Sequence, residues 1–134
     1  MKYNDFRDRE AWKKCREIRR KIGNLCKNFP NQEKHRLSDQ MIRASRSSTA
    51  NIAEGYGRYH FQENIQFCRK ARGSLYELID HVLVAEECEY IQHSLVDDLI
   101  EEIKTSIIVL NGYIKYLKSR KGNTQHHPLD NLTI

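Results

Sequence analysis

Residues 51–58 read Asn-Ile-Ala-Glu-Gly-Tyr-Gly-Arg, and they close a region that carries little charge. Between Ala44 and Gly57 only Arg46 and Glu54 are charged, in a chain whose residues are 31% Asp, Glu, Lys and Arg. A gap of this kind predicts a helix with surfaces from which water is excluded. The two glycines at its end indicate where that helix stops, because glycine adopts left-handed cap conformations at little cost.

Apolar residues recur at helical spacing on both sides of this region. Cys15, Ile18, Ile22 and Leu25 illustrate the pattern, with steps of three and four residues. The pattern predicts four helices, over residues 5–28, 33–56, 61–89 and 94–120. Because the connections are short, neighbouring helices should be antiparallel. We therefore predict a single-domain, all-α, up-down-up-down four-helix bundle over residues 1–120, followed by a polar C-terminal tail over residues 121–134.

Three local features refine this prediction. Ser94 is a candidate N-cap for the fourth helix, because its hydroxyl can accept a bond from a free amide of the first turn. Gly73 and Gly112 fall inside predicted helices, where glycine costs about 1 kcal/mol against alanine. They therefore indicate close approach of a neighbouring helix at these two positions.

Charge is distributed unevenly along the chain. Residues 1–72 hold 18 Lys and Arg against 8 Asp and Glu, whereas residues 73–134 hold 5 against 10, which gives the overall net charge of +5. A basic half and an acidic half favour either a polyanionic partner or association between copies. No apolar run approaches the ~18 residues of a membrane span, and the first 20 residues carry charges throughout. We expect a cytoplasmic protein with no membrane partner and with reduced, mainly buried cysteines.

The first predicted helix carries a basic line opposite its apolar stripe. Asp8, Glu10 and Glu17 flank this line, and no acidic residue lies on it. Such a line can neutralise a phosphate backbone, and arginine's planar fork suits phosphate. A basic face that is merely solvated, or that binds an acidic protein, remains an alternative. The predicted nucleic-acid-binding residues are Arg9, Lys13, Arg16, Arg20 and Lys27.

The second predicted helix has small or apolar residues on the side opposite its core stripe. A helix with no charged face is buried on both sides. In a four-helix monomer, we expect another subunit to cover the outer side. The predicted homo-oligomer interface consists of Ile42, Ser45, Thr49, Ala53 and Tyr56. The alternative is a weakly polar face without a partner.

Several sequence blocks resemble the four helix bundle protein family, also called the 23S rRNA intervening-sequence proteins. The blocks are Phe29-Pro30, Glu33-Lys34, Leu37, Gln40-Met41, Arg43-Ala44, Asn51 to Gly55, Gly57-Arg58, Phe67 and Ala71 to Glu77. The resemblance covers roughly residues 12–117. Its structural motif residues here are Asn51, Glu54, Gly55, Gly57, Arg58 and Gly73. The chain departs from the commoner pattern over residues 47–50.

The resemblance implies a four-helix bundle that assembles as a ring-shaped pentamer with a basic surface. Some members are encoded within insertions of 23S rRNA genes. Others are accessory variability determinants of diversity-generating retroelements, which bind a reverse transcriptase together with RNA or DNA. A homo-oligomer, nucleic acid and a reverse transcriptase are therefore the implied partners.

We find no residue pattern for catalysis, a metal or a cofactor, and we expect neither an enzyme nor a small-molecule substrate. His126-His127, and His81 with Cys88 seven residues later, lack the further ligands that zinc requires. Glu54 is better explained by an ion pair with Arg58 at i+4. Asn51 is similarly placed for a local hydrogen bond.

Overall fold

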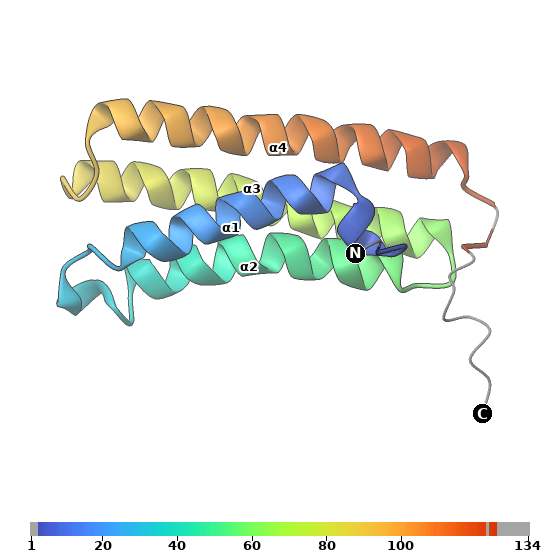
Figure 1. Cartoon of the computed structure of the whole chain (residues 1–134), viewed down its shortest axis with the longest axis horizontal. Helices are drawn as coiled ribbons and strands as arrows, with labels where there is room; N and C mark the ends of the chain where they lie inside the picture. Colours follow the sequence, from blue (N-terminus) through green and yellow to red (C-terminus); the bar gives the residue numbers. More distant parts are fainter. Residues whose placement is uncertain (1–2, 123, 126–134) are drawn as a thin grey trace.

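The computed structural model describes residues 3–122 and 124–125, most of which lie in four long helices. The helices are α1 (Glu10–Cys26), α2 (Leu37–Tyr56), α3 (Phe61–Glu87) and α4 (His93–Ser119), with short 3-10 turns η1 (Phe6–Asp8) and η2 (Asn31–Glu33). Successive helices run in opposite directions (Figure 1). Helices α1 and α3 each pack against both α2 and α4. The predicted all-α four-helix bundle is confirmed.

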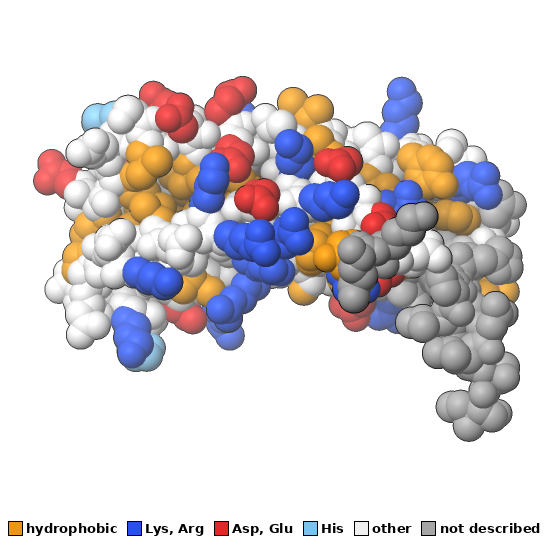
Figure 2. Space-filling view, in the orientation of Figure 1, with side chains coloured by type: hydrophobic (Ala, Val, Ile, Leu, Met, Phe, Trp, Pro, Cys, Tyr) orange, Lys and Arg blue, Asp and Glu red, His pale blue; other side chains and the backbone are white. Residues whose placement is uncertain are grey.

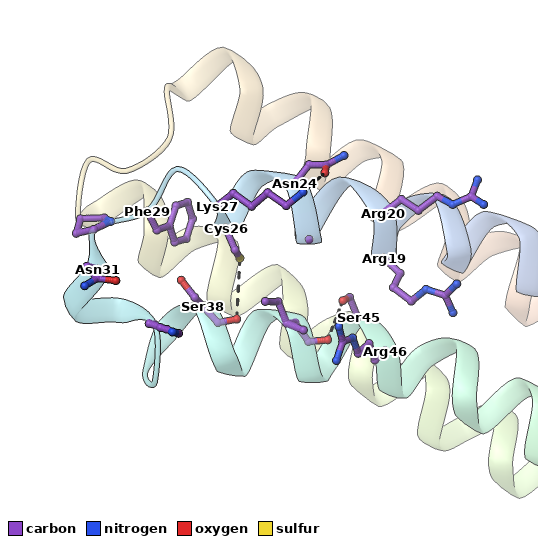
Figure 3. A pocket seen from close by; sticks show the side chains of 14 residues that line it. Arg19, Arg20, Asn24, Cys26, Lys27, Phe29, Asn31, Ser38, Ser45 and Arg46 are labelled. Carbon is purple, nitrogen blue, oxygen red and sulfur yellow. Dashed lines mark hydrogen bonds between the residues drawn. The ribbon is translucent and has the colours of Figure 1, made fainter.

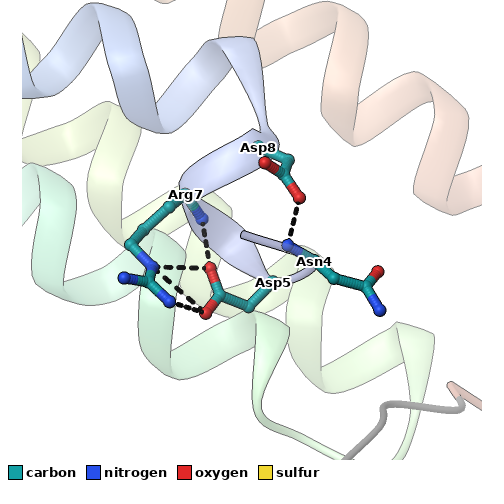
Figure 4. A network of polar contacts seen from close by, with 4 residues as sticks. All are labelled: Asn4, Asp5, Arg7 and Asp8. Carbon is teal, nitrogen blue, oxygen red and sulfur yellow. Dashed lines mark hydrogen bonds and ion pairs between the residues drawn. The ribbon is translucent and has the colours of Figure 1, made fainter. Parts of the chain in front are cut away.

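The chain enters α1 through a separate turn, although a single helix from Asp5 was predicted. The Asp5 carboxylate accepts a hydrogen bond from the Arg7 amide at 2.9 Å and pairs with the Arg7 guanidinium at 2.7 Å (Figure 4). These contacts close η1, and Arg9 then takes an extended conformation with φ −79° and ψ 127°. The extended residue turns the chain, so that α1 begins only at Glu10.

Two other helix starts also differ from prediction. Turn η2 occupies the residues after Pro30, so α2 begins at Leu37 instead of Glu33. Helix α4 begins at His93 with Gln92 at its N-cap, and no side chain caps it. The predicted N-cap role of Ser94 is therefore wrong, because that residue already lies inside the first turn.

The core forms where the four apolar stripes meet. Ile18, Ile22, Met41, Ile52 and Leu75 are fully buried there, as are the stripe residues of α4 such as Ile103 and Leu110. Three of the four cysteines are buried, as expected. Burial raises the pKa of the Cys15 and Cys26 thiols to about 11 and that of Cys68 to about 12. These cysteines act as small apolar side chains.

Close packing of α2 on α3 depends on Gly55. A Cβ at this position would lie 2.6 Å from Asn64 Oδ1 and 2.9 Å from Phe67 Cβ. Gly55 is thus a contact residue inside α2, and Gly57 caps the helix with an ordinary right-handed φ of −75°. The predicted left-handed stop at these glycines is wrong. A Cβ at Gly73 or Gly112 would meet nothing within 4 Å, so the predicted close approach of a neighbouring helix at these two glycines is wrong.

The chain beyond α4 returns to the corner between α2 and α3. The backbone amide of Gln125 donates to the Tyr59 carbonyl at 2.8 Å. In its side chain, Gln125 Oε1 accepts from buried Asn64 Nδ2 at 2.6 Å. Gln125 is only 4% exposed. The packed body therefore reaches past residue 120, into the segment predicted to be a polar tail. His126-His127 lie outside the described residues.

Candidate nucleic-acid interface

A groove of about 770 Å³ runs between α1 and α2, next to the turn that joins them. Five cationic residues line it, and the described lining residues include no Asp or Glu (Figure 3). The five are Arg19, Arg20, Lys27, Lys34 and Arg46. Cations gathered without carboxylates favour a polyanion at this place.

Hydrogen bonds across the helix seam hold part of this cluster. Arg19 Nη1 donates to Thr49 Oγ1 at 3.0 Å, and the Thr49 hydroxyl donates to the Arg46 carbonyl at 3.0 Å. Arg19 from α1 and Arg46 from α2 thereby flank the groove. Arg46 and Lys34 make no ion pair with any described residue, so both side chains can bind an external anion.

Short side chains form the floor of the groove. Ser38, Ile42 and Ser45 of α2 line it. Ser45 Oγ donates to the Ile42 carbonyl at 2.9 Å, so the hydroxyl is satisfied within its own helix. A helix face made of short, internally bonded residues leaves space beneath the cationic rim.

The basic surface continues along the same seam. A shallower depression of about 400 Å³ has Arg19 and Arg46 in its lining and extends to Trp12 and Ala53. Figure 2 shows Lys and Arg side chains gathered over α1 and α2, with Asp and Glu side chains both toward α4 and among the cations over α1. The two depressions share Arg19 and Arg46 and together make a track along the α1–α2 seam, whose cations all line the deeper groove.

Only part of the predicted basic line belongs to this track. Arg20 and Lys27 border the groove. Lys13 Nζ lies 3.6 Å from Glu10 Oε1, and Arg20 Nη1 lies 3.4 Å from Glu17 Oε1. The flanking carboxylates of Glu10 and Glu17 therefore pair with two cations of the predicted line.

The remaining two predicted residues point elsewhere. The Arg16 guanidinium lies 5.2 Å from the Trp12 ring centroid, and its Nε is 4.0 Å from Glu17 Oε1. Arg9 turns to the other end of the bundle, where its guanidinium lies 5.5 Å from the Tyr113 ring centroid. An ideal helix from Asp5 would have kept Arg9 on the line, and the extended backbone before α1 moves it away.

Sequence reasoning missed Arg19, Lys34 and Arg46. Arg46 carried a signal, because it is the sole positive charge between Ala44 and Gly57. Arg19 lies beside the line on a helical wheel, and Lys34 lies in the loop region. Only the packing of α1 on α2 brings the three residues to one groove.

The predicted oligomer face is partly buried within the single chain. Ser45 and Thr49 are 1% and 3% exposed, because α1 covers this side of α2. Ile42, Ala53 and Tyr56 are half-buried. The reasoning that only another subunit can cover this face therefore fails at Ser45 and Thr49, while the interface itself stays a prediction.

The model of the 23S rRNA-intervening sequence protein family matches residues 7–112. The chain belongs to this family. It is also similar to a crystal structure of an S23 ribosomal protein family member of unknown function from Bacteroides thetaiotaomicron, with 24% identity and a TM-score of 0.72. That similarity covers 78% of this chain and 95% of the other, and it supports the fold. No curated protein matches the chain.

The blocks that carried the family resemblance have structural roles in this member. Arg58 Nη2 pairs with Glu54 Oε1 at 3.1 Å, and Asn51 Nδ2 donates to the Ser47 carbonyl at 2.9 Å, so both local predictions are confirmed. The Ser47 and Ser74 hydroxyls lie 2.8 Å apart and join α2 to α3. The first two contacts support the end of α2, and the Ser47–Ser74 contact holds the second and third helices together.

The described residues of this family member include no group of three or more His, Cys, Asp or Glu that could hold a metal ion. His81 Nε2 lies 3.0 Å from Glu77 Oε2, and Cys88 is exposed. None of the described helices is long and apolar enough to cross a membrane.

Proposed function

We propose that this protein is a non-enzymatic adaptor that acts as a homo-oligomer and binds nucleic acid through the α1–α2 groove. The observation that carries the proposal is the set of five Lys and Arg residues around a groove whose described lining has no carboxylate. Cationic side chains can replace the counterions of a phosphate backbone, and two of the five, Lys34 and Arg46, have no ion pair with a described residue. Arginine forks add directed hydrogen bonds to phosphate oxygens.

The expected recognition is of backbone and shape. Trp12, Phe29 and Phe6 are the aromatic residues in the described lining of the track. Trp12 and Phe29 are each only 8% exposed and Phe6 is half-buried, so the track offers little area for base stacking. Contacts to phosphates position a protein without reading sequence. Structured RNA is the first ligand to test, because the family is named for 23S rRNA. Duplex DNA is the second.

The dependence of nucleic-acid affinity on salt concentration can be calculated from the number of cations in the groove. If all five cations contact phosphates, log affinity falls with log salt with a slope of about −4.5 for duplex DNA. A rise from about 50 to about 200 mM salt then weakens binding about 500-fold. Two fewer contacts reduce this loss to about 40-fold.

The test is fluorescence anisotropy of labelled RNA and DNA over a salt series. Lys34→Gln with Arg46→Gln removes two groove cations that have no described ion pair. Lys104→Gln with Lys115→Gln is the matched control, because it changes net charge equally on exposed positions of α4. We expect the salt slope to fall by about two in the groove variant alone. Equal slopes in the two double variants would refute the groove as the binding surface.

A protein-interaction scaffold is the second candidate function. Lys21 Nζ pairs with Glu102 Oε2 at 2.6 Å, which shows that the basic α1 and the acidic α4 attract each other within one chain. The same attraction between copies would use the groove cations for assembly. Light scattering after gel filtration separates the candidates: loss of assembly in the groove variant, without nucleic-acid binding by the wild type, supports the scaffold.

The family resemblance adds a reverse transcriptase as a proposed partner of the adaptor. The acidic exposed residues of α4, such as Asp97, Asp98 and Glu101, leave a second surface for a protein while the groove holds nucleic acid. Genes beside the coding sequence provide the check. A reverse transcriptase with a variable repeat supports this role, and a position inside an rRNA gene supports the intervening-sequence role.

A further inference from the structure

A second, smaller pocket lies at the opposite end of the bundle from the α1–α2 turn. It measures about 220 Å³ and lies between the start of α1, the ends of α2 and α4, and the start of α3. Arg9 and Arg120 line it together with the rings of Tyr56, Phe61, Tyr113 and Tyr116. The described lining residues include no Asp or Glu.

Local backbone geometry brings the two arginines into this pocket. The extended backbone of Arg9 turns its side chain toward the bundle end, where the guanidinium lies 5.7 Å from the Tyr56 centroid and 6.0 Å from the Tyr116 centroid. Arg120 caps the C-terminus of α4, with its guanidinium 5.9 Å from the Phe61 centroid. Neither arginine forms an ion pair with a described carboxylate.

Two guanidinium groups that share a pocket without a counter-charge repel each other, and a bound anion relieves that repulsion. A terminal phosphate carries close to two negative charges near neutral pH, whereas an internal phosphodiester carries one. Each guanidinium presents a planar set of donors that matches phosphate oxygens. The pair therefore suits a terminal phosphate better than the internal backbone that the groove would hold.

The aromatic lining and the size define the rest of the ligand. The Tyr116 ring stacks on Tyr113 with centroids 6.4 Å apart and is still 47% exposed, so its exposed part can contact a base. The pocket is smaller than the roughly 300 Å³ at which pockets for whole drug-sized ligands begin. It therefore has space for a phosphate and the nearest part of a nucleoside, and the remainder of the ligand must extend outward.

We propose that this pocket binds a terminal nucleotide through its phosphomonoester, with Arg9 and Arg120 on the phosphate and Tyr116 against the base. The ligand is either a free nucleotide or the phosphorylated end of a strand, which share this chemistry. The strand-end form rests on the proposed nucleic-acid function, whereas the free-nucleotide form does not.

The experiment compares two oligonucleotides of one sequence, with a 5′-phosphate or a 5′-hydroxyl, by anisotropy of a 3′ label on the full-length protein. We expect the phosphorylated strand to bind about tenfold more tightly, the effect of one charge-assisted hydrogen bond. Arg120→Gln should bring the ratio close to one. Lys118→Gln, an exposed change at the same end of α4 that does not line the pocket, should preserve it.

Adenosine monophosphate and adenosine, added as competitors, distinguish the two sources. Competition by the monophosphate but not by adenosine assigns the pocket to the free nucleotide as well. If the 5′-phosphorylated strand binds more tightly than the 5′-hydroxyl strand and adenosine monophosphate does not compete, the pocket is assigned to strand ends. Equal affinity for both strands with no binding of the monophosphate would overturn the proposal, as would a ratio unchanged by Arg120→Gln.

The groove variant keeps this test separate from the proposed function. Lys34→Gln with Arg46→Gln should weaken both strands alike and leave their ratio unchanged. If neither strand binds the wild type, calorimetric titration with adenosine monophosphate decides the matter. Binding that Arg120→Gln abolishes then supports the pocket, and absence of binding refutes it.

Discussion

Replacing Gly55 with alanine would place a methyl group against α3 at a close contact in the α2–α3 seam. The new Cβ would lie 2.6 Å from Asn64 Oδ1, 2.9 Å from Phe67 Cβ and 3.1 Å from the Asn64 carbonyl oxygen. Two of these atoms belong to the backbone or are attached directly to it. They cannot move unless α3 itself shifts, and Asn64 is also held by its hydrogen bond to Gln125.

The magnitude follows from two opposing effects. Alanine in a helix interior gains about 1 kcal/mol over glycine, while overpacking of a closed core costs about 1–3 kcal/mol. Because the contacts are below 3.0 Å, we expect the cost near the upper value and a net loss of about 2 kcal/mol of unfolding free energy. At roughly 3–5 °C per kcal/mol for a chain of this size, the melting temperature falls by about 8 °C.

Gly73→Ala and Gly112→Ala are the matched controls, because a Cβ at either position meets nothing within 4 Å. Each should gain up to about 1 kcal/mol from helix propensity. Thermal unfolding followed by circular dichroism at one fixed protein concentration measures all three variants. The packing argument is refuted if Gly55→Ala is as stable as the wild type or shifts in the same direction as the controls.

Other predictions follow from the end of the bundle, the cysteines and the N-terminal turn. Gln125→Ala should cost about 1–2 kcal/mol in urea unfolding, because it leaves the buried Asn64 amide short of an acceptor; unchanged stability would contradict this. At pH 8, mass spectrometry should find an alkylating reagent on exposed Cys88 alone, because the other three thiols are buried and have raised pKa values. The Arg7 guanidinium lowers the pKa of Asp5 below 3.8, so their contact persists above that pH and is lost as pH falls through the lowered value. An NMR titration should show this midpoint, and Arg7→Gln should return it to the ordinary range.

The sequence was sufficient for the architecture because each helix repeats its apolar positions over several turns. The stripes containing Ile18, Ile52, Leu75 and Ile103 all meet in the core. The helix starts were less predictable, since η1 and η2 depend on contacts such as the Asp5–Arg7 pair that no periodicity reveals. The pattern shows where a helix persists and says less about the turn that precedes it.

The candidate site depends on packing between elements, and there prediction was less successful. A helical wheel continued α1 back through Arg9 and placed that residue on one line with Arg20, although the extended backbone at Arg9 turns its side chain into the pocket at the end of the bundle. It could not bring Arg46 of α2 next to Arg19 of α1. The small residues Ser45 and Thr49 were correctly identified as buried, but the element that covers them is α1 of the same chain.

The depth of the α1–α2 groove and its charge depend on different residues. Ser45 sets the depth beneath the cations, and its hydroxyl has its partner in its own helix. A bulkier residue there would make the groove shallower while every rim cation stays in place. Under the proposed nucleic-acid function, a substitution at this one position would change the thickness of strand that the groove accepts while the dependence of binding on salt stays similar, so that selectivity for ligand shape changes independently of affinity for phosphate.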